Sequence, residues 1–164
     1  MDVKSSNSYP SSMLSNFHPH TFTFRGTTFP SMESLLQGIK SPDIEQQNNI
    51  FKLVGLQAKR SGKPINWYDK RLLYFQGQPI DRFSQEYQNF LDEAFEALSQ
   101  NKAFRKALLD SGNEPITHSI GRSDPNKTVL TEQEFVSRLM KLRNKLQGQS
   151  QTANKEKDFP DLGF

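Results

Sequence analysis

The chain has 164 residues, with 21 Lys and Arg against 18 Asp and Glu, so its formal net charge at pH 7 is +3. This length fits one domain with a substantial hydrophobic core, and the mild basic excess suits phosphate-bearing ligands but falls short of the basic stripe of a dedicated DNA-binding protein. The lack of cysteine excludes disulfides, thiolate zinc sites and thiol nucleophiles. No apolar stretch could span a membrane and no signal peptide is recognisable, so we expect a cytoplasmic protein.

The chain begins with a segment of low hydrophobicity. Residues 1–12 are rich in Ser and Asn and are predicted to form a flexible N-terminus. After it, Phe22 and Phe24 alternate with threonines up to Gly26, and Phe29 continues the pattern beyond that turn. We therefore predict a small β-hairpin with one apolar face that covers a side of the core.

A short amphipathic helix is predicted from Ser31 to Lys40. Ser31 supplies a hydroxyl N-cap, an acidic residue occupies the first turn, and Pro42 ends the helix. An apolar stripe with the spacing of a helix that packs inward consists of Met32, Leu35, Leu36 and Ile39. A second stripe, a quarter turn away, consists of Glu33, Gln37 and Lys40. This polar stripe either lines a cleft or forms a solvated face, and composition does not decide between the two.

Four further helices and one irregular region are predicted before residue 148. The first helix is capped by Ser41, runs through Phe51 and Val54, and ends before residues 61–62. Residues 64–83 contain two prolines and a glycine and are predicted to be irregular, with one turn of helix near residues 67–73. The remaining helices are predicted at residues 84–98, 103–109 and 131–147.

The last predicted helix and the segments on either side of it carry three further signals. Thr131 and Glu134 have the spacing of a capping box, and the loop 117–131 leads into this helix N-terminus, where phosphate can be held. The polar tail 148–164 is predicted to lie outside the domain. Its last residues, 158–164, mix apolar and acidic side chains and resemble a docking peptide for a protein partner, although we expect fraying or folding back on the domain ahead of docking.

Together these elements predict a mostly helical α+β domain over residues 13–147, in which a small N-terminal β-hairpin packs on several helices. A Gly-rich phosphate loop, a nucleophile elbow and an HExxH pair are absent from the sequence. His18 and His20 have no third ligand nearby, so we expect no metal and no cofactor.

The first 40 residues resemble a known family. Leu14-Ser15-Asn16-Phe17-His18-Pro19 is followed by Phe29-Pro30-Ser31-Met32-Glu33 and then by Gln37 and Lys40. This order closely resembles the opening of the NADAR or YbiA-like family, in which an L-S-N-F-Y segment leads into a helix reading roughly S/T-x-E-H-x-x-Q-x-x-K. Looser similarity continues through residues 58–67 and 95–109. The chain departs from the family pattern at Ser34, where the family has His, and in residues 117–124, which lack the family's Trp-Gly.

The resemblance implies a YbiA-like fold and hydrolysis of an N-glycosidic bond between a ribose C1 and nitrogen. The implied substrates are ADP-ribose carried on guanine bases of DNA or RNA, or a ribosylamino-pyrimidine phosphate of the riboflavin pathway. A non-catalytic module that binds ADP-ribose or a nucleotide is the alternative, and a purely structural adaptor is a third possibility. No membrane partner is expected.

The same resemblance suggests roles for the polar stripe. Glu33 would act as general acid and base, because a carboxyl beside an apolar surface can have a raised pKa. Lys40 would attack the aldehyde-level carbon of the opened ribose to form a Schiff base, or would only stabilise that sugar electrostatically. Substrate contacts are expected from Asn16, Phe17, Gln37, Trp67, Arg71, His118 and Asp124.

Several of these assignments have structural alternatives. Asn16 can cap a turn and Asp124 can begin an Asp-Pro turn, so neither requires a ligand. Phe17 and Trp67 are residue types that anchor cores, and Gln37 can lie on the surface.

Overall fold

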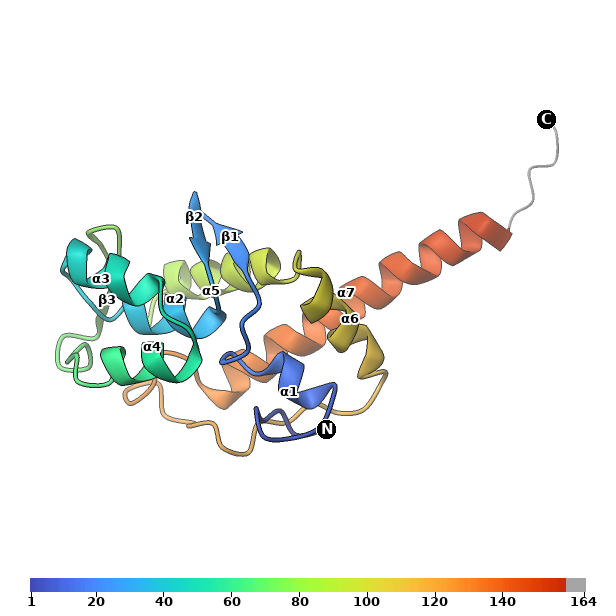
Figure 1. The fold of residues 1–164 in the computed structure, drawn as a ribbon, viewed down its shortest axis with the longest axis horizontal. Coiled ribbons are helices and arrows are strands. Elements are labelled where there is room, and N and C mark those ends of the chain that lie inside the picture. Colours follow the sequence, from blue (N-terminus) through green and yellow to red (C-terminus); the bar gives the residue numbers. More distant parts are fainter. Residues whose placement is uncertain (159–164) are drawn as a thin grey trace.

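The computed structural model describes the backbone of residues 1–158 and the side chains of residues 1–149. Over this range the chain forms seven helices and two two-stranded antiparallel sheets (Figure 1). The elements are α1 (Ser11–Leu14), β1 (Phe22–Phe24), β2 (Thr27–Phe29), α2 (Met32–Gly38), α3 (Ile44–Phe51), α4 (Gly55–Gly62), β3 (Leu72–Phe75), β4 (Gln78–Asp81), α5 (Gln85–Leu98), α6 (Lys102–Asp110) and α7 (Glu132–Asp158). The predicted mostly helical α+β domain is confirmed.

The core is rich in phenylalanine and joins the two hairpins to the helices. Phe90 of α5 contacts Phe24 of β1 and Phe75 of β3, with ring centroids 5.1 and 5.6 Å apart. Phe29 of β2 meets Phe51 of α3 at 4.7 Å. Such edge-to-face contacts stabilise aromatic cores beyond the burial of their area. Because the rings come from five elements, they hold the hairpins, α3 and α5 around α2.

Two hairpins flank this core, and only the first was predicted. β1 and β2 pair in the register Phe22 opposite Phe29, which confirms the hairpin read from the alternation. The prediction for residues 64–83 is wrong, because Leu72–Phe75 pairs with Gln78–Asp81 in place of the expected turn of helix. Gln76 and Gly77 both have positive φ, the backbone that a tight two-residue hairpin turn requires.

The helix predicted from Ser41 to residues 61–62 is in fact two helices. Asp43, and not Ser41, caps α3, since its side chain accepts a hydrogen bond from the backbone N–H of Gln46. The chain then breaks after Phe51 and resumes as α4 at Gly55, whose φ of +52° lies in the left-handed region. Only glycine adopts this conformation without strain, so the break is set by the backbone.

The N-terminus also differs from its prediction as a flexible segment. Val3 is fully buried, and its N–H donates to the carbonyl of Thr117 at 2.8 Å. The Asp2 carboxylate accepts from the N–H and the hydroxyl of Ser119, at 2.8 and 2.6 Å. The first residues are thus bound to the loop that precedes α7.

Helix α7 begins as predicted and ends later than predicted. Thr131 and Glu134 form the capping box, with reciprocal bonds of 2.8 and 3.1 Å. The helix continues through Asp158 and projects away from the domain (Figure 1), where a polar tail was expected from Gly148 onward. No proline interrupts residues 149–158, so nothing in the local sequence stops the helix. Of the predicted docking peptide, residues 159–164 lie outside the described residues.

A buried ion pair fastens α7 to the rest of the fold. The guanidinium of Arg82 is almost inaccessible to solvent and binds the Glu134 carboxylate in a bidentate manner, at 2.7 and 3.1 Å. Arg82 also donates to the carbonyl of Thr128, and Gln88 donates to Glu134. These bonds fix the end of the loop that leads into α7.

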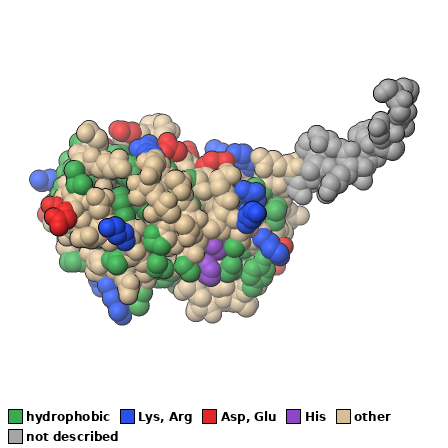
Figure 2. Space-filling model, turned by 45° about the horizontal axis from the view of Figure 1, so that its top comes forward, with side chains coloured by type: hydrophobic (Ala, Val, Ile, Leu, Met, Phe, Trp, Pro, Cys, Tyr) green, Lys and Arg blue, Asp and Glu red, His purple; other side chains and the backbone are tan. Residues whose placement is uncertain are grey.

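The outer surface carries charges of both signs. On the face shown in Figure 2, basic and acidic side chains are intermixed among hydrophobic ones. Among the described residues, no helix is both long enough and apolar enough to cross a membrane.

Candidate active site

Helix α2 carries the predicted catalytic residue Glu33, and it ends at Gly38, two residues before Lys40 and earlier than the predicted helix Ser31–Lys40. Every residue from Ser31 to Ile39 is buried. Ser31 caps the helix as predicted, and the hydroxyl of Ser34 donates to the carbonyl of Ser31 at 2.6 Å. The Ser34 side chain, at the position where the NADAR or YbiA-like family has His, is therefore hydrogen-bonded within the first turn of its own helix.

Two glycines allow the neighbouring helices to approach α2 closely. A Cβ at Gly38 would lie 2.3 Å from the ring of Phe51 in α3, and a Cβ at Gly62 would lie 2.2 Å from Oε1 of Gln37. Contacts this short are not possible for real side chains, so both positions require glycine unless the neighbour moves. Helix α4 therefore packs directly over the polar stripe of α2.

Glu33 is a buried carboxyl with a raised pKa. Its side chain is 8% exposed, and its Oε1 accepts a hydrogen bond from Nε2 of Gln37 at 2.7 Å. Burial raises the pKa of Glu33, and the bond from Gln37 and the charges of Lys40 and Lys59 oppose that rise only in part. A carboxyl in this state can hold a proton closer to neutral pH and exchange it with a bound substrate.

Lys40, at the other end of the stripe, has a pKa that changes in the opposite direction. Burial lowers its pKa from 10.5 to about 8, the negative charge of Glu33 opposes this shift, and the positive charges of Arg122 and Lys59 add to it. A lysine near pKa 8 has a substantial neutral fraction close to physiological pH. Among the ion pairs of residues 1–149, Glu33 and Lys40 form none with each other, which leaves both groups available to a ligand.

The loop before β1 closes one side of this group. The carbonyl of Asn16 accepts the N–H of Glu33 at 3.1 Å, so the loop is attached to the first turn of α2. Nζ of Lys59 lies 5.5 Å from the centroid of the Phe17 ring. A Cβ at Gly55 would lie 3.0 Å from the carbonyl oxygen of Phe17. Phe17 is thus held between the start of α4 and the cation of Lys59.

Two buried oxygens in this region have no hydrogen-bond partner. They are Oδ1 of Asn16 and Oε1 of Gln37, and both are acceptors. A buried polar atom without a partner costs on the order of 1–3 kcal/mol. Hydroxyl groups of a bound sugar are donors that would satisfy such oxygens.

The structure thus brings five predicted site residues into one region: Asn16, Phe17, Glu33, Gln37 and Lys40. The other four lie in different surroundings. Trp67 belongs to the hydrophobic core, and the guanidinium of Arg71 lies 5.2 Å from the ring centroid of Phe83. The ring of His118 bonds to the carbonyl of Val3 at 2.8 Å, and Asp124 accepts from the backbone and side chain of Asn126 in a turn.

Two residues that the sequence analysis did not assign to the site join it in the structure. Lys59 and Arg122 both act electrostatically on Lys40. The backbone of Arg122 is anchored at the start of α7, because its carbonyl accepts a hydrogen bond from the N–H of Glu132. Lys59 could have been suspected as one of the basic residues at the end of the helix predicted to stop before residues 61–62. Arg122 lies in the loop 117–131 that was predicted to hold phosphate, but the sequence did not single it out, because its approach to Lys40 depends on the path of that loop.

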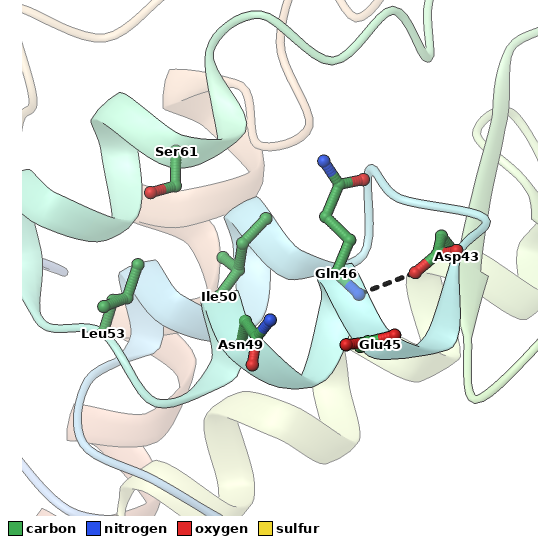
Figure 3. A pocket seen from close by; sticks show the side chains of 7 residues that line it. All are labelled: Asp43, Glu45, Gln46, Asn49, Ile50, Leu53 and Ser61. Atoms are coloured by element: carbon green, nitrogen blue, oxygen red, sulfur yellow. Dashed lines mark hydrogen bonds between the residues drawn. The ribbon is translucent and has the colours of Figure 1, made fainter.

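A cavity of about 690 Å³ lies between α3 and α4 (Figure 3). It is lined by Asp43, Glu45, Gln46, Asn49, Ile50, Leu53 and Ser61. Residues 59 and 61 point about 200° apart on a helix, so the cavity and the Glu33 group are separated by α4. None of the side chains that line this cavity has a buried polar atom without a hydrogen-bond partner. The cavity therefore lacks the unsatisfied acceptors found on Asn16 and Gln37.

Within the described residues, no group of three or more His, Cys, Asp or Glu side chains is arranged to hold a metal ion. The rings of His18 and His20 lie 4.3 Å apart, and Nε2 of His20 bonds to the carbonyl of Met13 at 2.7 Å. Burial lowers the pKa of His20. These histidines are explained by local packing.

Comparisons with known proteins support the fold and identify the family. The NMR structure of the E. coli protein YbiA is similar to 90% of this chain, covering 83% of the YbiA chain, with a TM-score of 0.59 and 17% sequence identity. The predicted YbiA-like fold is therefore confirmed. An uncharacterized 17.1 kDa protein in the Gp30-rIII intergenic region of Enterobacteria phage T4 is 38% identical over 149 residues, which cover 89% of this chain and 98% of the relative. The family model described as Bacteriophage protein GP30.3 matches residues 8–144. The chain therefore belongs to the Bacteriophage protein GP30.3 family.

Proposed function

We propose that the protein is an N-glycosidase that cleaves the bond between a ribose C1 and a nitrogen of a heterocycle. The observation that carries this proposal is a pair of oppositely perturbed groups: the buried Glu33 carboxyl of α2, with its raised pKa, and the half-buried Lys40 amine just beyond the end of α2, with its lowered pKa. Groups whose surroundings move their pKa values toward neutrality are suited to proton transfer and nucleophilic attack at the same centre.

The proposed reaction begins with opening of the ribose ring, in which Glu33 donates its proton to the ring oxygen while the lone pair of the heterocycle nitrogen forms a C1=N iminium. Nζ of neutral Lys40 then adds to C1, and Glu33 carries a proton from the Lys40 nitrogen to the heterocycle nitrogen, which departs with the electron pair of the C1–N bond. The resulting Schiff base between C1 and Lys40 is hydrolysed when water adds to C1 and the amine departs. The sugar is released as an aldehyde that recloses, and both side chains return to their starting states.

The spacing of the two groups agrees with this sequence of steps. Seven residues separate Glu33 from Lys40, which corresponds to about 10 Å along a helix axis. The groups therefore approach each other only through a ligand that lies between them. Oδ1 of Asn16 and Oε1 of Gln37 are acceptors that ribose hydroxyls would satisfy, and Phe17 offers a ring for the base.

The substrate classes proposed are ADP-ribose on guanine bases of nucleic acid and ribosylamino-pyrimidine phosphates. Both carry phosphate, and the site holds three cations, Lys40, Lys59 and Arg122, against one carboxylate. A surplus of positive charge in a partly buried site favours an anionic ligand.

The same surplus supports a second candidate, a module that binds ADP-ribose without cleaving it. Binding alone would use the cations and the unpaired amide oxygens, and it would not need the perturbed carboxyl of Glu33. The two candidates differ in one outcome, which is whether sugar is released.

The test is incubation of the purified chain with ADP-ribosylated DNA and, separately, with the ribosylaminouracil phosphate, followed by mass spectrometry of the products. We expect sugar release from at least one substrate, and loss of at least a hundredfold in rate for Glu33→Gln and for Lys40→Ala. The matched controls Glu86→Gln and Lys102→Ala change exposed residues on α5 and α6 and should retain activity. Saturable binding of ADP-ribose without release of sugar from either substrate would favour the binding module.

A further inference from the structure

Positive charge is concentrated in one stretch of the chain, residues 52–71. This stretch holds six of the 21 basic residues and one of the 18 acidic residues, so the rest of the chain has 15 basic residues against 17 acidic ones. The whole chain's modest net charge thus conceals a basic segment beside an otherwise slightly acidic molecule. We call residues 52–71 the basic segment.

The cations of the basic segment are exposed and unpaired. None of them takes part in an ion pair among residues 1–149, and all six are solvent-exposed: Lys52, Lys59, Arg60, Lys63, Lys70 and Arg71. The single acid, Asp69, accepts a hydrogen bond from the side chain of Asn66 at 2.8 Å. Lys106 and Lys145 have acidic partners, at 2.6 and 2.7 Å, whereas Lys102 and Lys141 are also exposed and form no ion pair among residues 1–149.

Exposed aromatic rings accompany these cations. Tyr68 is 51% exposed and rests against the buried Trp67 at 6.2 Å, so its outer face is open while its position is fixed. Phe83 is 48% exposed and lies 5.2 Å below the guanidinium of Arg71. Large aromatic side chains are normally buried, and exposed ones among cations form a surface on which unstacked bases can stack.

The basic segment is continuous with the candidate active site. Lys59 belongs to both, since its amine lies over the Phe17 ring and its charge acts on Glu33 and Lys40. Lys63 follows four residues after Lys59, a spacing that places two side chains on the same side of a helix. A chain of phosphates lying along the segment would therefore lead to the site.

We propose that the basic segment, together with Phe83, binds the backbone and unstacked bases of single-stranded nucleic acid next to the site on α2. The partner is single-stranded because an exposed ring can stack only on a base that is not already stacked in a duplex. This proposal deepens the proposed function, as it favours a modified nucleic acid strand over a free metabolite as substrate. Strand binding itself does not depend on cleavage, so the two can fail separately.

The test measures binding of an unmodified, fluorescently labelled DNA single strand to the full chain by anisotropy, at about 50 and 200 mM salt. The variant Arg60→Gln/Lys63→Gln/Lys70→Gln removes three cations from the segment and leaves Lys59 in place. We expect affinity at low salt to fall at least tenfold. The slope of log affinity against log salt should shrink by about 2, because each phosphate contact on a single strand contributes roughly 0.7.

A matched control removes the same charge elsewhere. The variant Lys102→Gln/Lys106→Gln/Lys141→Gln changes exposed residues on α6 and α7, and its affinity should remain within about twofold to threefold of the unmodified chain. Equal losses in the two triple variants would show that only net charge matters and would overturn the proposal. No measurable binding by the unmodified chain at low salt would overturn it as well.

Tyr68 tests stacking separately from charge. Tyr68→Ala should weaken strand binding roughly fivefold or more, the lower end for one base stacked on an aromatic ring, whereas Tyr68→Phe should preserve it. Unchanged binding in Tyr68→Ala would remove the stacking part and, with it, the preference for single strands. Strand binding is measured with unmodified DNA and needs no turnover, whereas glycosidase activity is measured by release of sugar, so a failure of strand binding is distinguishable from a failure of the proposed glycosidase activity.

Discussion

The pKa of Lys40 should respond in opposite directions to the loss of its different neighbours. Arg122→Ala removes a positive charge that disfavours the ammonium form, so the pKa of Lys40 should rise from about 8, and Lys59→Ala should act in the same direction. Glu33→Gln removes the negative charge that favours the ammonium form, so the pKa should fall further. A control, Lys141→Ala on the exposed side of α7, removes a cation that does not act on Lys40 and should leave its pKa unchanged.

The size of the effect follows from the shift itself. A change from 10.5 to about 8 leaves about one amine in ten neutral at pH 7, compared with about one in 3,000 for an unperturbed lysine. This is a gain of about 300-fold in the nucleophilic form, or about 3 kcal/mol. The same pKa shift destabilises the folded protein at neutral pH. Because the folded-state pKa is lowered, the unfolded chain binds the proton more tightly, and stability falls as the pH decreases from about 10.5 through about 8.

The assay is an NMR titration of lysine amines labelled by reductive methylation, with the Lys40 signal assigned by its absence from Lys40→Arg. We expect a midpoint near pH 8 that moves upward in Arg122→Ala. A midpoint near 10, or a downward movement on removal of Arg122, would refute the electrostatic account of the site.

Three further variants test other parts of the structure. Glu33→Gln should abolish turnover yet stabilise the fold at pH 8 and raise its Tm, because a carboxyl with a raised pKa makes folding less favourable as the pH rises through that pKa; a Tm well below that of the unmodified chain would contradict this. Gly62→Ala places a methyl group against Gln37, so we expect at least a tenfold loss of turnover and about 1–3 kcal/mol of stability, and unchanged kinetics would show that the close approach is not needed. Arg82→Met leaves the Glu134 carboxylate without its buried partner and should cost about 3–5 kcal/mol in urea unfolding, and a loss below 1 kcal/mol would argue against a structural role for the pair.

The features that sequence reasoning predicted are those set by local spacing. The stripe on α2 with its Ser31 cap, the first hairpin, α5, α6 and the Thr131 capping box all depend on residues within a few positions of one another. Each has a pattern that can be read without knowing what lies across the domain.

The features that were missed depend on contacts distant in sequence or on special backbone geometry. The break before Gly55 is coupled to the carbonyl of Phe17, and the N-terminus is fixed by the hydrogen bonds that Ser119 donates to Asp2. Pro79 made residues 64–83 look irregular, although it pairs with Tyr74 in a short hairpin.

In the candidate site, too, local spacing predicted some features, and contacts distant in sequence determine the others. Glu33 and Gln37 share one face of α2, Lys40 follows just beyond its end, and all three were found from their spacing, whereas the burial of Glu33 and Gln37 depends on α4 packing through Gly62. Arg122 reaches Lys40 only through the path of the loop before α7. A linear pattern does not contain that information.

The most direct test of the central claim is borohydride reduction during turnover, followed by peptide mapping of the protein by tandem mass spectrometry. If Lys40 attacks C1 of the opened ribose, reduction will leave the sugar attached to the peptide that contains Lys40, and the adduct will be absent from Lys40→Ala, which will also fail to release sugar. Release of sugar by Lys40→Ala at the rate of the unmodified chain, with no adduct on Lys40 in either protein, would contradict the claim.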